Sequence, residues 1–258
     1  MTRRVAVVGG ATSGLGAACA RALAEQGCDL LLWARTEARL AEAAAELAGP
    51  GRDVRTVVAD ASEPDAAARV ATAAEEHFGR VDVLVLNAGG PPVATADHVD
   101  ADGLRAALQL LTVTPVDLAN RLLPGMRERG SGRILAILSS GVREPIDNLA
   151  YSNVGRAALM AWLKTLARTV AADGVTVNGV IPGRLATPRV DSLDAAAAAR
   201  TGRAVEQVRA DSAGAIPVGR YGDPGELGAL VGFLASDAAS YITGTTIPVD
   251  GGMLRGLP

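Results

Sequence analysis

The sequence predicts a single α/β domain in which one parallel β-sheet lies between two layers of helices. Short runs rich in Val, Leu and Ile recur along the chain, and Ala-rich stretches with helical periodicity separate them. Strands that are apolar throughout are buried on both faces, which is typical of a parallel sheet covered by helices.

We expect about seven strands, because seven apolar runs of strand length are bounded by polar or glycine-containing segments. They are Val5–Val8, Leu30–Trp33, Val54–Ala59, Val81–Leu86, Ile134–Leu138, Val175–Ile181 and Thr246–Val249. The segments between them have helical spacing, and their alanines and leucines favour helix. They include Ala17–Glu25, Thr36–Leu47, Ala66–His77, Leu104–Arg129 and Ala157–Ala172.

The stretch from Asp191 to Ala213 interrupts this alternation of strands and helices and is rich in alanine. We interpret the segment at about 185–216 as a helical lid over a ligand crevice, since it does not resemble a linker. We therefore predict one domain over residues 1–258.

The composition argues against several other classes of protein. A formal net charge of −3 over 258 residues does not suit a nucleic-acid binder, whose affinity comes largely from basic residues. No run approaches the ~20 uninterrupted apolar residues of a membrane helix. Cys19 and Cys28 are too few for a disulfide scaffold, so we expect a cytoplasmic protein. His77 and His98 have no metal-ligand spacing, and we predict no metal site.

A glycine-rich turn follows the first predicted strand and precedes an Ala-rich helix. It reads Gly9-Gly10-Ala11-Thr12-Ser13-Gly14-Leu15-Gly16. Glycines at these positions allow a tight turn and a close approach of the backbone to a pyrophosphate, and the helix N-terminus adds free N–H groups. The turn predicts a doubly wound, Rossmann-type sheet that binds a dinucleotide where the strand order reverses.

The spacing Gly10-x-x-x-Gly14-x-Gly16 resembles that of the short-chain dehydrogenase/reductase family. Further motifs match in family order along essentially the whole chain, most closely those of β-ketoacyl-carrier-protein reductases. They are Asp60, Asn87-Ala88-Gly89, Gly132-Arg133-Ile134, Ser139, Pro182-Gly183 with Thr187, Ile216-Pro217-x-Gly219-Arg220, Thr243-Gly244 and Asp250-Gly251-Gly252.

The resemblance implies a nicotinamide cofactor, with Asp60 at the adenine, Asn87-Ala88-Gly89 along the cofactor, and Pro182-Gly183 and Thr187 at the carboxamide. The predicted cofactor-binding residues are Gly10, Thr12, Ser13, Gly14, Leu15, Gly16, Arg35, Asp60, Ala61, Asn87, Ala88, Gly89, Arg156, Pro182, Gly183 and Thr187. Leu86 and Gly9 replace the family's Asn and Thr, which removes two hydrogen-bonding side chains and lowers the expected affinity.

The end of the second predicted strand bears on the choice of cofactor. Arg35 stands where an NAD site usually has a carboxylate for the ribose hydroxyls. A guanidinium pairs well with a phosphate, so the sequence favours NADP(H) over NAD(H). Ser13 weakens this preference, because many NADP-binding relatives carry a second basic residue in the glycine turn.

The family's chemistry uses Ser, Tyr and Lys with an assisting Asn, and here the sequence departs. Counting without gaps from Gly132 puts Ser139 in the serine position, Ser152 in the tyrosine position, Arg156 in the lysine position and Leu111 in the asparagine position. In the other register Tyr151 supplies the phenol, but Gly155 then replaces lysine. We favour the ungapped register and keep Ser139, Tyr151, Ser152 and Arg156 as candidate catalytic residues.

Three functions remain open. The first is an NADP(H)-dependent oxidoreductase that reduces a carbonyl to an alcohol, or the reverse, with an atypical proton donor and a small or carrier-linked substrate. The second is a non-redox dehydratase, cyclase or isomerase on the same fold, and the third is a silent dinucleotide-binding subunit. The resemblance also implies a homotetramer or homodimer formed through the helices Leu104–Arg129 and Ser152–Ala172.

Overall fold

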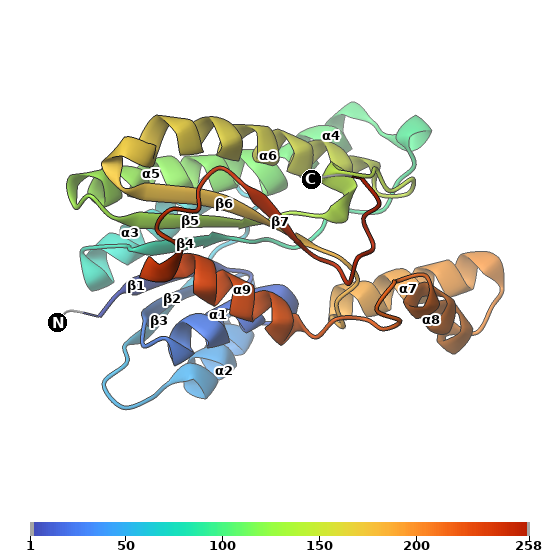
Figure 1. The fold of residues 1–258 in the computed structure, drawn as a ribbon, viewed down its shortest axis with the longest axis horizontal. Helices are drawn as coiled ribbons and strands as arrows, with labels where there is room; N and C mark the ends of the chain where they lie inside the picture. Colours follow the sequence, from blue (N-terminus) through green and yellow to red (C-terminus); the bar gives the residue numbers. More distant parts are fainter. Residues whose placement is uncertain (1–2, 257–258) are drawn as a thin grey trace.

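The computed structural model describes residues 3–256, and in them one parallel sheet is covered by helices on both faces (Figure 1). The strand order is β3-β2-β1-β4-β5-β6-β7, with every neighbouring pair parallel. The strands are β1 (Val5–Gly9), β2 (Asp29–Ala34), β3 (Val54–Val58), β4 (Val83–Leu86), β5 (Gly132–Ile137), β6 (Val175–Pro182) and β7 (Thr246–Val249). The seven predicted strands are confirmed, with their ends displaced by at most two residues.

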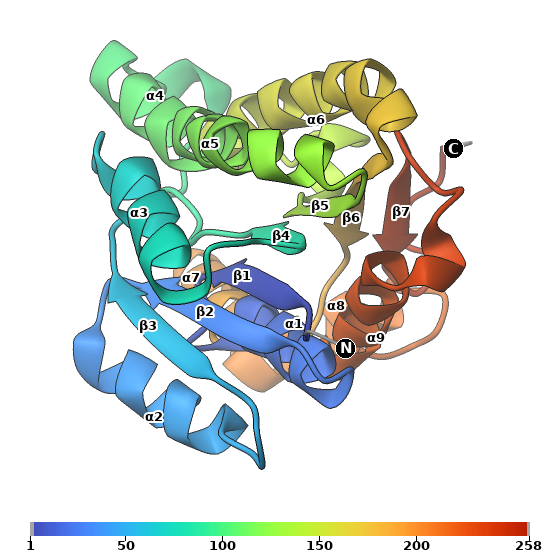
Figure 2. The ribbon, with the colours of Figure 1, turned by 90° about the vertical axis from the view of Figure 1, so that its left-hand side faces the viewer.

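Helices cover the sheet in two layers, which Figure 2 shows above and below the strands. One layer holds α1 (Gly14–Glu25), α2 (Glu37–Leu47) and α9 (Pro224–Ala235). The other holds α3 (Ala66–Phe78), α4 (Ala101–Leu108), α5 (Thr114–Glu128) and α6 (Ala150–Val170). The two remaining helices, α7 (Pro188–Thr201) and α8 (Val205–Gly214), lie beyond the carboxyl ends of the strands (Figure 1).

The apolar strands are explained by a core on each face of the sheet. Alternate side chains of a strand point to opposite faces. Val7 and Leu31 accordingly join the core beneath α3, α5 and α6, whereas Val8 and Leu32 join the core beneath α1 and α9. All four side chains are fully buried, so burial on both faces favours apolar residues throughout the strand.

Two predicted helices have other bounds in the structure. The segment Leu104–Arg129, expected as one helix, is divided by a π-helical turn at Gln109–Val113, and α4 begins already at Ala101. The helix expected to begin at Ala157 begins at Ala150. Both differences concern residues beside the ligand cleft described below.

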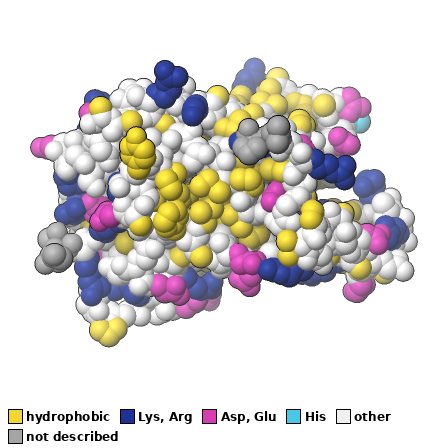
Figure 3. Space-filling model, in the orientation of Figure 1, with side chains coloured by type: hydrophobic (Ala, Val, Ile, Leu, Met, Phe, Trp, Pro, Cys, Tyr) yellow, Lys and Arg dark blue, Asp and Glu magenta, His cyan; other side chains and the backbone are white. Residues whose placement is uncertain are grey.

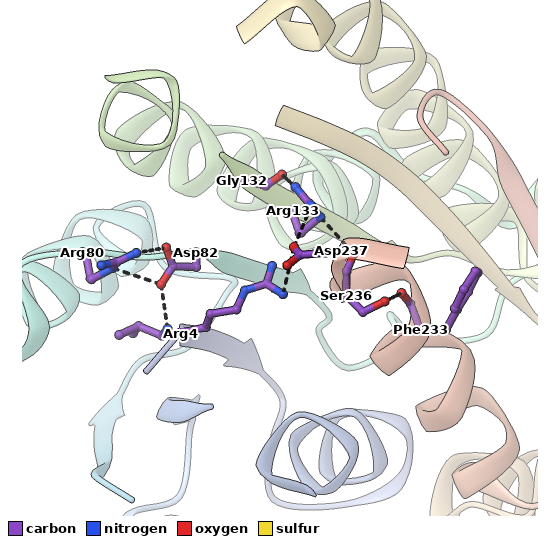
Figure 4. A network of polar contacts seen from close by, with 9 residues as sticks. Arg4, Arg80, Asp82, Gly132, Arg133, Phe233, Ser236 and Asp237 are labelled. Atoms are coloured by element: carbon purple, nitrogen blue, oxygen red, sulfur yellow. Dashed lines mark hydrogen bonds and ion pairs between the residues drawn. The ribbon is translucent and has the colours of Figure 1, made fainter. Parts of the chain in front are cut away.

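A polar network holds the strands together at their amino ends (Figure 4). The buried Asp82 carboxylate accepts a hydrogen bond of 2.8 Å from the backbone N–H of Val5 and one of 2.6 Å from Arg80. Arg133 reaches Asp237 at 3.4 Å, and Arg4 lies 3.9 Å from the same carboxylate. The network joins β1, β4 and β5 at the end of the sheet opposite the cleft.

None of the described helices has the length and apolar character needed to cross a membrane. Figure 3 shows apolar side chains gathered on the face that carries β7, and a hollow between the body and the α7–α8 segment with basic side chains nearby. We call the segment α7–α8 the lid.

Candidate functional site

The carboxyl ends of β1, β4, β5 and β6 open into a cleft of about 1180 Å³. The strand order reverses at β1, because β2 and β3 lie on one side of it and β4 to β7 lie on the other. Sheets of this kind bind ligands at the point of reversal, beyond the carboxyl ends of the strands. The cleft brings together most of the residues that the sequence predicts for the site. They are Gly10, Thr12, Ser13, Gly14, Leu15, Arg35, Asp60, Ala61, Asn87, Ala88, Gly89, Ser139, Ser152, Arg156, Pro182, Gly183 and Thr187. Gly16 lies behind its wall, and Tyr151 lies outside it.

The glycine-rich turn lines one part of the cleft. The Gly10 N–H donates to the Trp33 carbonyl at 2.9 Å, and the Asn87 amide donates to the Gly9 carbonyl at 3.0 Å. Helix α1 begins at Gly14, and Ser13 before it makes no side-chain cap. A Cβ at Gly16 would lie 2.2 Å from the Gly10 carbonyl oxygen, so only glycine permits this turn. The open helix N-terminus suits the phosphates of a dinucleotide.

The far end of the cleft carries two arginines. Arg35, at the end of β2, lies 3.9 Å from the Asp60 carboxylate. Burial raises the pKa of Asp60, but hydrogen bonds from Ser62 and the nearby Arg35 charge outweigh it, so the pKa is lower than usual. Arg39 of α2 lines the same end. Sequence reasoning missed Arg39, because no motif marks it.

Ser139 lies at the other end of the cleft, directly after β5. Its Oγ accepts a hydrogen bond of 3.1 Å from the Gly141 N–H and caps the short helix that follows. Because this bond uses the oxygen as acceptor, the hydroxyl hydrogen remains available to a ligand. Ser139 is thus placed to donate a hydrogen bond to a substrate oxygen.

Ser152 and Arg156 line the cleft from one face of α6, one turn apart. Among the described residues no group hydrogen-bonds to the Ser152 hydroxyl, which leaves it free for a ligand. The Arg156 guanidinium donates one hydrogen bond to the Ile137 carbonyl at the end of β5. Burial, and next to it the charge of Arg189, lowers the pKa of Arg156 to about 10.

The structure does not bring Tyr151 to these residues. Its side chain is buried against α4, where the phenol oxygen accepts a hydrogen bond of 3.2 Å from the Asp100 N–H and lies against Gly103. Consecutive residues of a helix point about 100° apart, so Tyr151 faces away when Ser152 faces the cleft. Ser152 therefore lines the cleft with Ser139 and Arg156, whereas the phenol of Tyr151 packs outside it.

An apolar side chain, that of Leu111, packs against Gly155, the residue before Arg156 on α6. The two residues pack closely, and Leu111 lies in the π-helical turn. The Thr112 hydroxyl donates to the Gly155 carbonyl at 2.8 Å and fixes this contact. The room above Gly155 is filled by Leu111 and offers no path for the phenol of Tyr151.

The lid is joined to the body of the molecule by polar contacts. Asp194 of α7 is fully buried, and it accepts hydrogen bonds from Arg184 and, at 2.9 Å, from the Tyr221 hydroxyl. Arg189, near the start of α7, reaches across the cleft and donates to the Pro91 carbonyl at 3.0 Å. Arg189 and Arg156 both line the cleft.

Comparison with known proteins agrees with this geometry. Residues 10–254 match the family model described as enoyl-(acyl carrier protein) reductase. The chain is 37% identical over 259 residues to the cis-4-hydroxycyclohexanecarboxylate dehydrogenase of Sinomonas cyclohexanicum, covering 96% of each chain.

Solved structures resemble the whole chain as well. The L-sorbose reductase of Gluconobacter frateurii, in complex with NADPH and L-sorbose, is 34% identical and superposes with a TM-score of 0.94 over 99% of this chain and 98% of its own. An NADPH-dependent reductase involved in bacilysin biosynthesis is 30% identical, with a TM-score of 0.95 over 99% and 100% of the two chains. Both relatives use the cofactor that Arg35 predicts for this chain.

Proposed function

Since the chain belongs to the short-chain dehydrogenase/reductase family, we propose that it is an NADP(H)-dependent oxidoreductase that interconverts a carbonyl and an alcohol. The observation that carries the proposal is one cleft with two functional ends. The glycine-rich turn and Arg35 lie at one end, and Ser139, Ser152 and Arg156 lie at the other.

The residues of the cleft fit a nicotinamide dinucleotide phosphate. The N-terminus of α1 suits the pyrophosphate, and Arg35 with Arg39 suits a 2′-phosphate, since a guanidinium binds phosphate with charge-assisted hydrogen bonds. When bound, the nicotinamide supplies or accepts the hydride. The Asp60 carboxylate partly neutralises the charge of Arg35, and Arg39 adds a second positive charge at this end of the cleft.

At the reactive end, three groups act on the oxygen of the substrate. The hydroxyls of Ser139 and Ser152 donate hydrogen bonds to it, and the Arg156 cation stabilises the negative charge that develops as hydride reaches the carbon. Of the five N–H groups of Arg156, the bond to Ile137 occupies one, so the others remain for ligands.

The proton source differs from that of the family. Ser152 is far too weak an acid to act as tyrosine does, and Leu111 removes the polar side chain behind the lysine position. We propose that Arg156 holds the alkoxide until water entering the cleft protonates it, and that the hydroxide formed leaves with exchanging water and is neutralised in the solvent. Hydride and proton together convert the carbonyl to the alcohol.

The test is to mix the protein with NADPH and a panel of ketones and to measure NADPH oxidation by the absorbance of the nicotinamide band. The proposal expects steady NADPH oxidation with at least one ketone and weaker activity with NADH. Conversion of a substrate without an absorbance change would instead indicate a non-redox enzyme. Tight NADPH binding without turnover of any compound would indicate a silent dinucleotide-binding subunit.

We also propose that the protein assembles as a homodimer or homotetramer through α5 and α6 and acts in the cytoplasm. Both statements rest on the family resemblance. The molar mass in solution, measured by light scattering, tests the first of them, and a monomer would overturn it.

A further inference from the structure

Among the described residues, two arginines line the same cleft without a carboxylate partner, although Glu144 and Asp147 also line it. Arg156 lines it from α6, and Arg189 lines it from the lid. Within residues 3–256, neither guanidinium forms an ion pair with an acidic side chain. Each donates instead to a neutral backbone carbonyl, Arg156 to Ile137 and Arg189 to Pro91.

Three other arginines of this region are paired with carboxylates, whereas Arg200, which also lines the cleft, forms no ion pair among the described residues. Arg184 pairs with Asp194, Arg203 with Asp211 and Arg209 with Asp191, the last at 3.2 Å. Arg203 and Arg209 lie outside the cleft wall, whereas Arg189 lies in it. Arg184 also lines the cleft, but Asp194 neutralises it, so the lid presents the charges of Arg189 and Arg200 to the cleft without acidic partners among the described residues.

The position of Arg189 is held by the loop after β4. Its guanidinium lies over Gly90, within about 3.0 Å of the point where a Cβ would stand, and donates to Pro91 at 3.0 Å. Gly89 and Gly90 of this loop line the cleft, so Arg189 connects the lid to this part of the cleft wall. Its charge is near enough to Arg156 to contribute to the lowered pKa of that group.

The phosphates of the cofactor do not account for this pair. The pyrophosphate fits the N-terminus of α1, and a 2′-phosphate fits Arg35 and Arg39. Arg156 and Arg189 surround the reactive end, beside Ser139 and Ser152, where the substrate binds. Two cations that repel each other in a partly enclosed cleft favour an anion between them.

We propose that Arg156 and Arg189 bind a carboxylate of the substrate, so that the protein acts on carbonyl compounds that carry an acid group near the reacting carbon. This proposal rests on the proposed reductase function and specifies its substrate class. Guanidinium groups suit a carboxylate because their planar N–H pairs match its two oxygens.

Binding to the NADP⁺-loaded protein tests the proposal without turnover. Calorimetry compares benzoate with benzamide, two probes of similar shape that differ in charge. We expect benzoate to bind more tightly by about 10- to 100-fold, the range of hydrogen bonds to charged groups. In the variant Arg189→Gln this preference should fall by most of that factor. Equal binding of the two probes, or no binding of benzoate, would overturn the proposal.

The control variant Arg203→Gln removes the same charge from the lid outside the cleft, and its exposed ion pair contributes little. It should retain the preference for benzoate. NADPH affinity is measured in parallel and should be unchanged in Arg189→Gln. If this variant weakens NADPH as strongly as benzoate, the pair serves the cofactor and the proposal is wrong.

Kinetics separates this proposal from the reductase function. NADPH oxidation with benzoylformate is compared with that of its methyl ester, and kcat/KM should favour the acid. If neutral ketones and esters are reduced equally well, the reductase function stands and the acid site falls. If benzoate binds through Arg189 and no carbonyl compound oxidises NADPH, the acid site stands and the reductase function falls.

Discussion

A serine and an arginine on α6 define what the reactive end can do. The Ser152 hydroxyl can donate a hydrogen bond but cannot act as the acid that a phenol provides. Arg156 holds a charge close to the Ser139 side of the cleft and is anchored by Ile137. The pair suits stabilisation of an alkoxide better than proton transfer, so catalysis relies on positioning and on charge.

The two registers make opposite predictions for neighbouring residues. Ser152→Ala removes a hydrogen bond to the substrate oxygen, and we expect kcat/KM to fall by roughly 10- to 100-fold. Tyr151→Phe removes only the bond to the Asp100 N–H, and we expect kcat/KM to stay within about three-fold of the wild type, since this bond lies outside the cleft. Steady-state NADPH oxidation measures both. A large loss of kcat/KM in Tyr151→Phe alone would contradict this expectation and indicate that the Tyr151 phenol acts in the site.

The charge of Arg156 should appear in the pH dependence of reduction. Its pKa is lowered to about 10, so the cation loses its proton at a lower pH than an ordinary arginine. We expect kcat/KM to be level below this value and to fall as pH rises through it. In Arg156→Lys the fall should move to lower pH, because lysine starts from a lower pKa and meets the same burial. A profile that is flat to high pH in both proteins would contradict this role.

At the scale of elements, the apolar runs predicted the strands and the glycine spacing predicted the turn, but the sequence did not predict every helix boundary. The break at Gln109–Val113 leaves the apolar spacing of its flanks intact, so the sequence pattern carries no sign of it. Helix α6 begins at Ala150 because its first turn packs on α4 through Tyr151, a tertiary contact that overrides the low propensity of Gly155.

Sequence reasoning also left α9 without an assignment. Its glycines lower helix propensity, and its apolar residues lie all round the helix instead of on one stripe. It forms because Gly228 and Gly232 let it approach α1 closely. In the site, motifs placed the residues at the strand ends, whereas Arg39 and Arg189 required the fold, since no motif marks them.

The N-terminus of α9 depends on a capping box that should be sensitive to acid. Glu226 accepts from the Asp223 N–H at 2.7 Å and from Arg220, and these bonds lower its pKa to about 2 from 4.5. The stabilisation is therefore complete above the unfolded pKa near 4.5 and disappears as pH falls toward 2.

We expect Glu226→Gln to unfold at a lower temperature than the wild type at neutral pH, and the difference to shrink between these two pH values. Calorimetric melting over this range measures it. A difference that stays constant down to pH 2 would show that the Glu226 carboxylate is not the source of the stabilisation.

The molecule as a whole separates stability from function along the strands. The amino ends are joined by the network of Asp82 and the arginines around it, and the carboxyl ends form the cleft. The cleft keeps backbone groups and charges free for ligands, and this lowers the stability of the fold. The rest of the molecule must compensate for that loss. The buried cores on both faces and the polar contacts at the amino ends supply this compensation.

Removing Asp82 should therefore cost stability throughout the sheet. Asp82→Ala leaves the buried Val5 N–H without its acceptor and removes the carboxylate that Arg80 and Arg129 face, and we expect a loss of about 3 kcal/mol in the free energy of unfolding. Asp102→Ala breaks the exposed pair with Arg105 and should cost less than about 1 kcal/mol. Urea unfolding compares the two variants, and losses of similar size would contradict the importance of the amino-end network.

The central claim is that one cleft holds NADPH and a carbonyl compound so that hydride passes between them. The most direct measurement uses NADPH deuterated at the nicotinamide carbon that gives up its hydride, mixed with the protein and a ketone that it converts. We predict that mass spectrometry finds the deuterium on the former carbonyl carbon of the alcohol. A converted product without deuterium would contradict the claim.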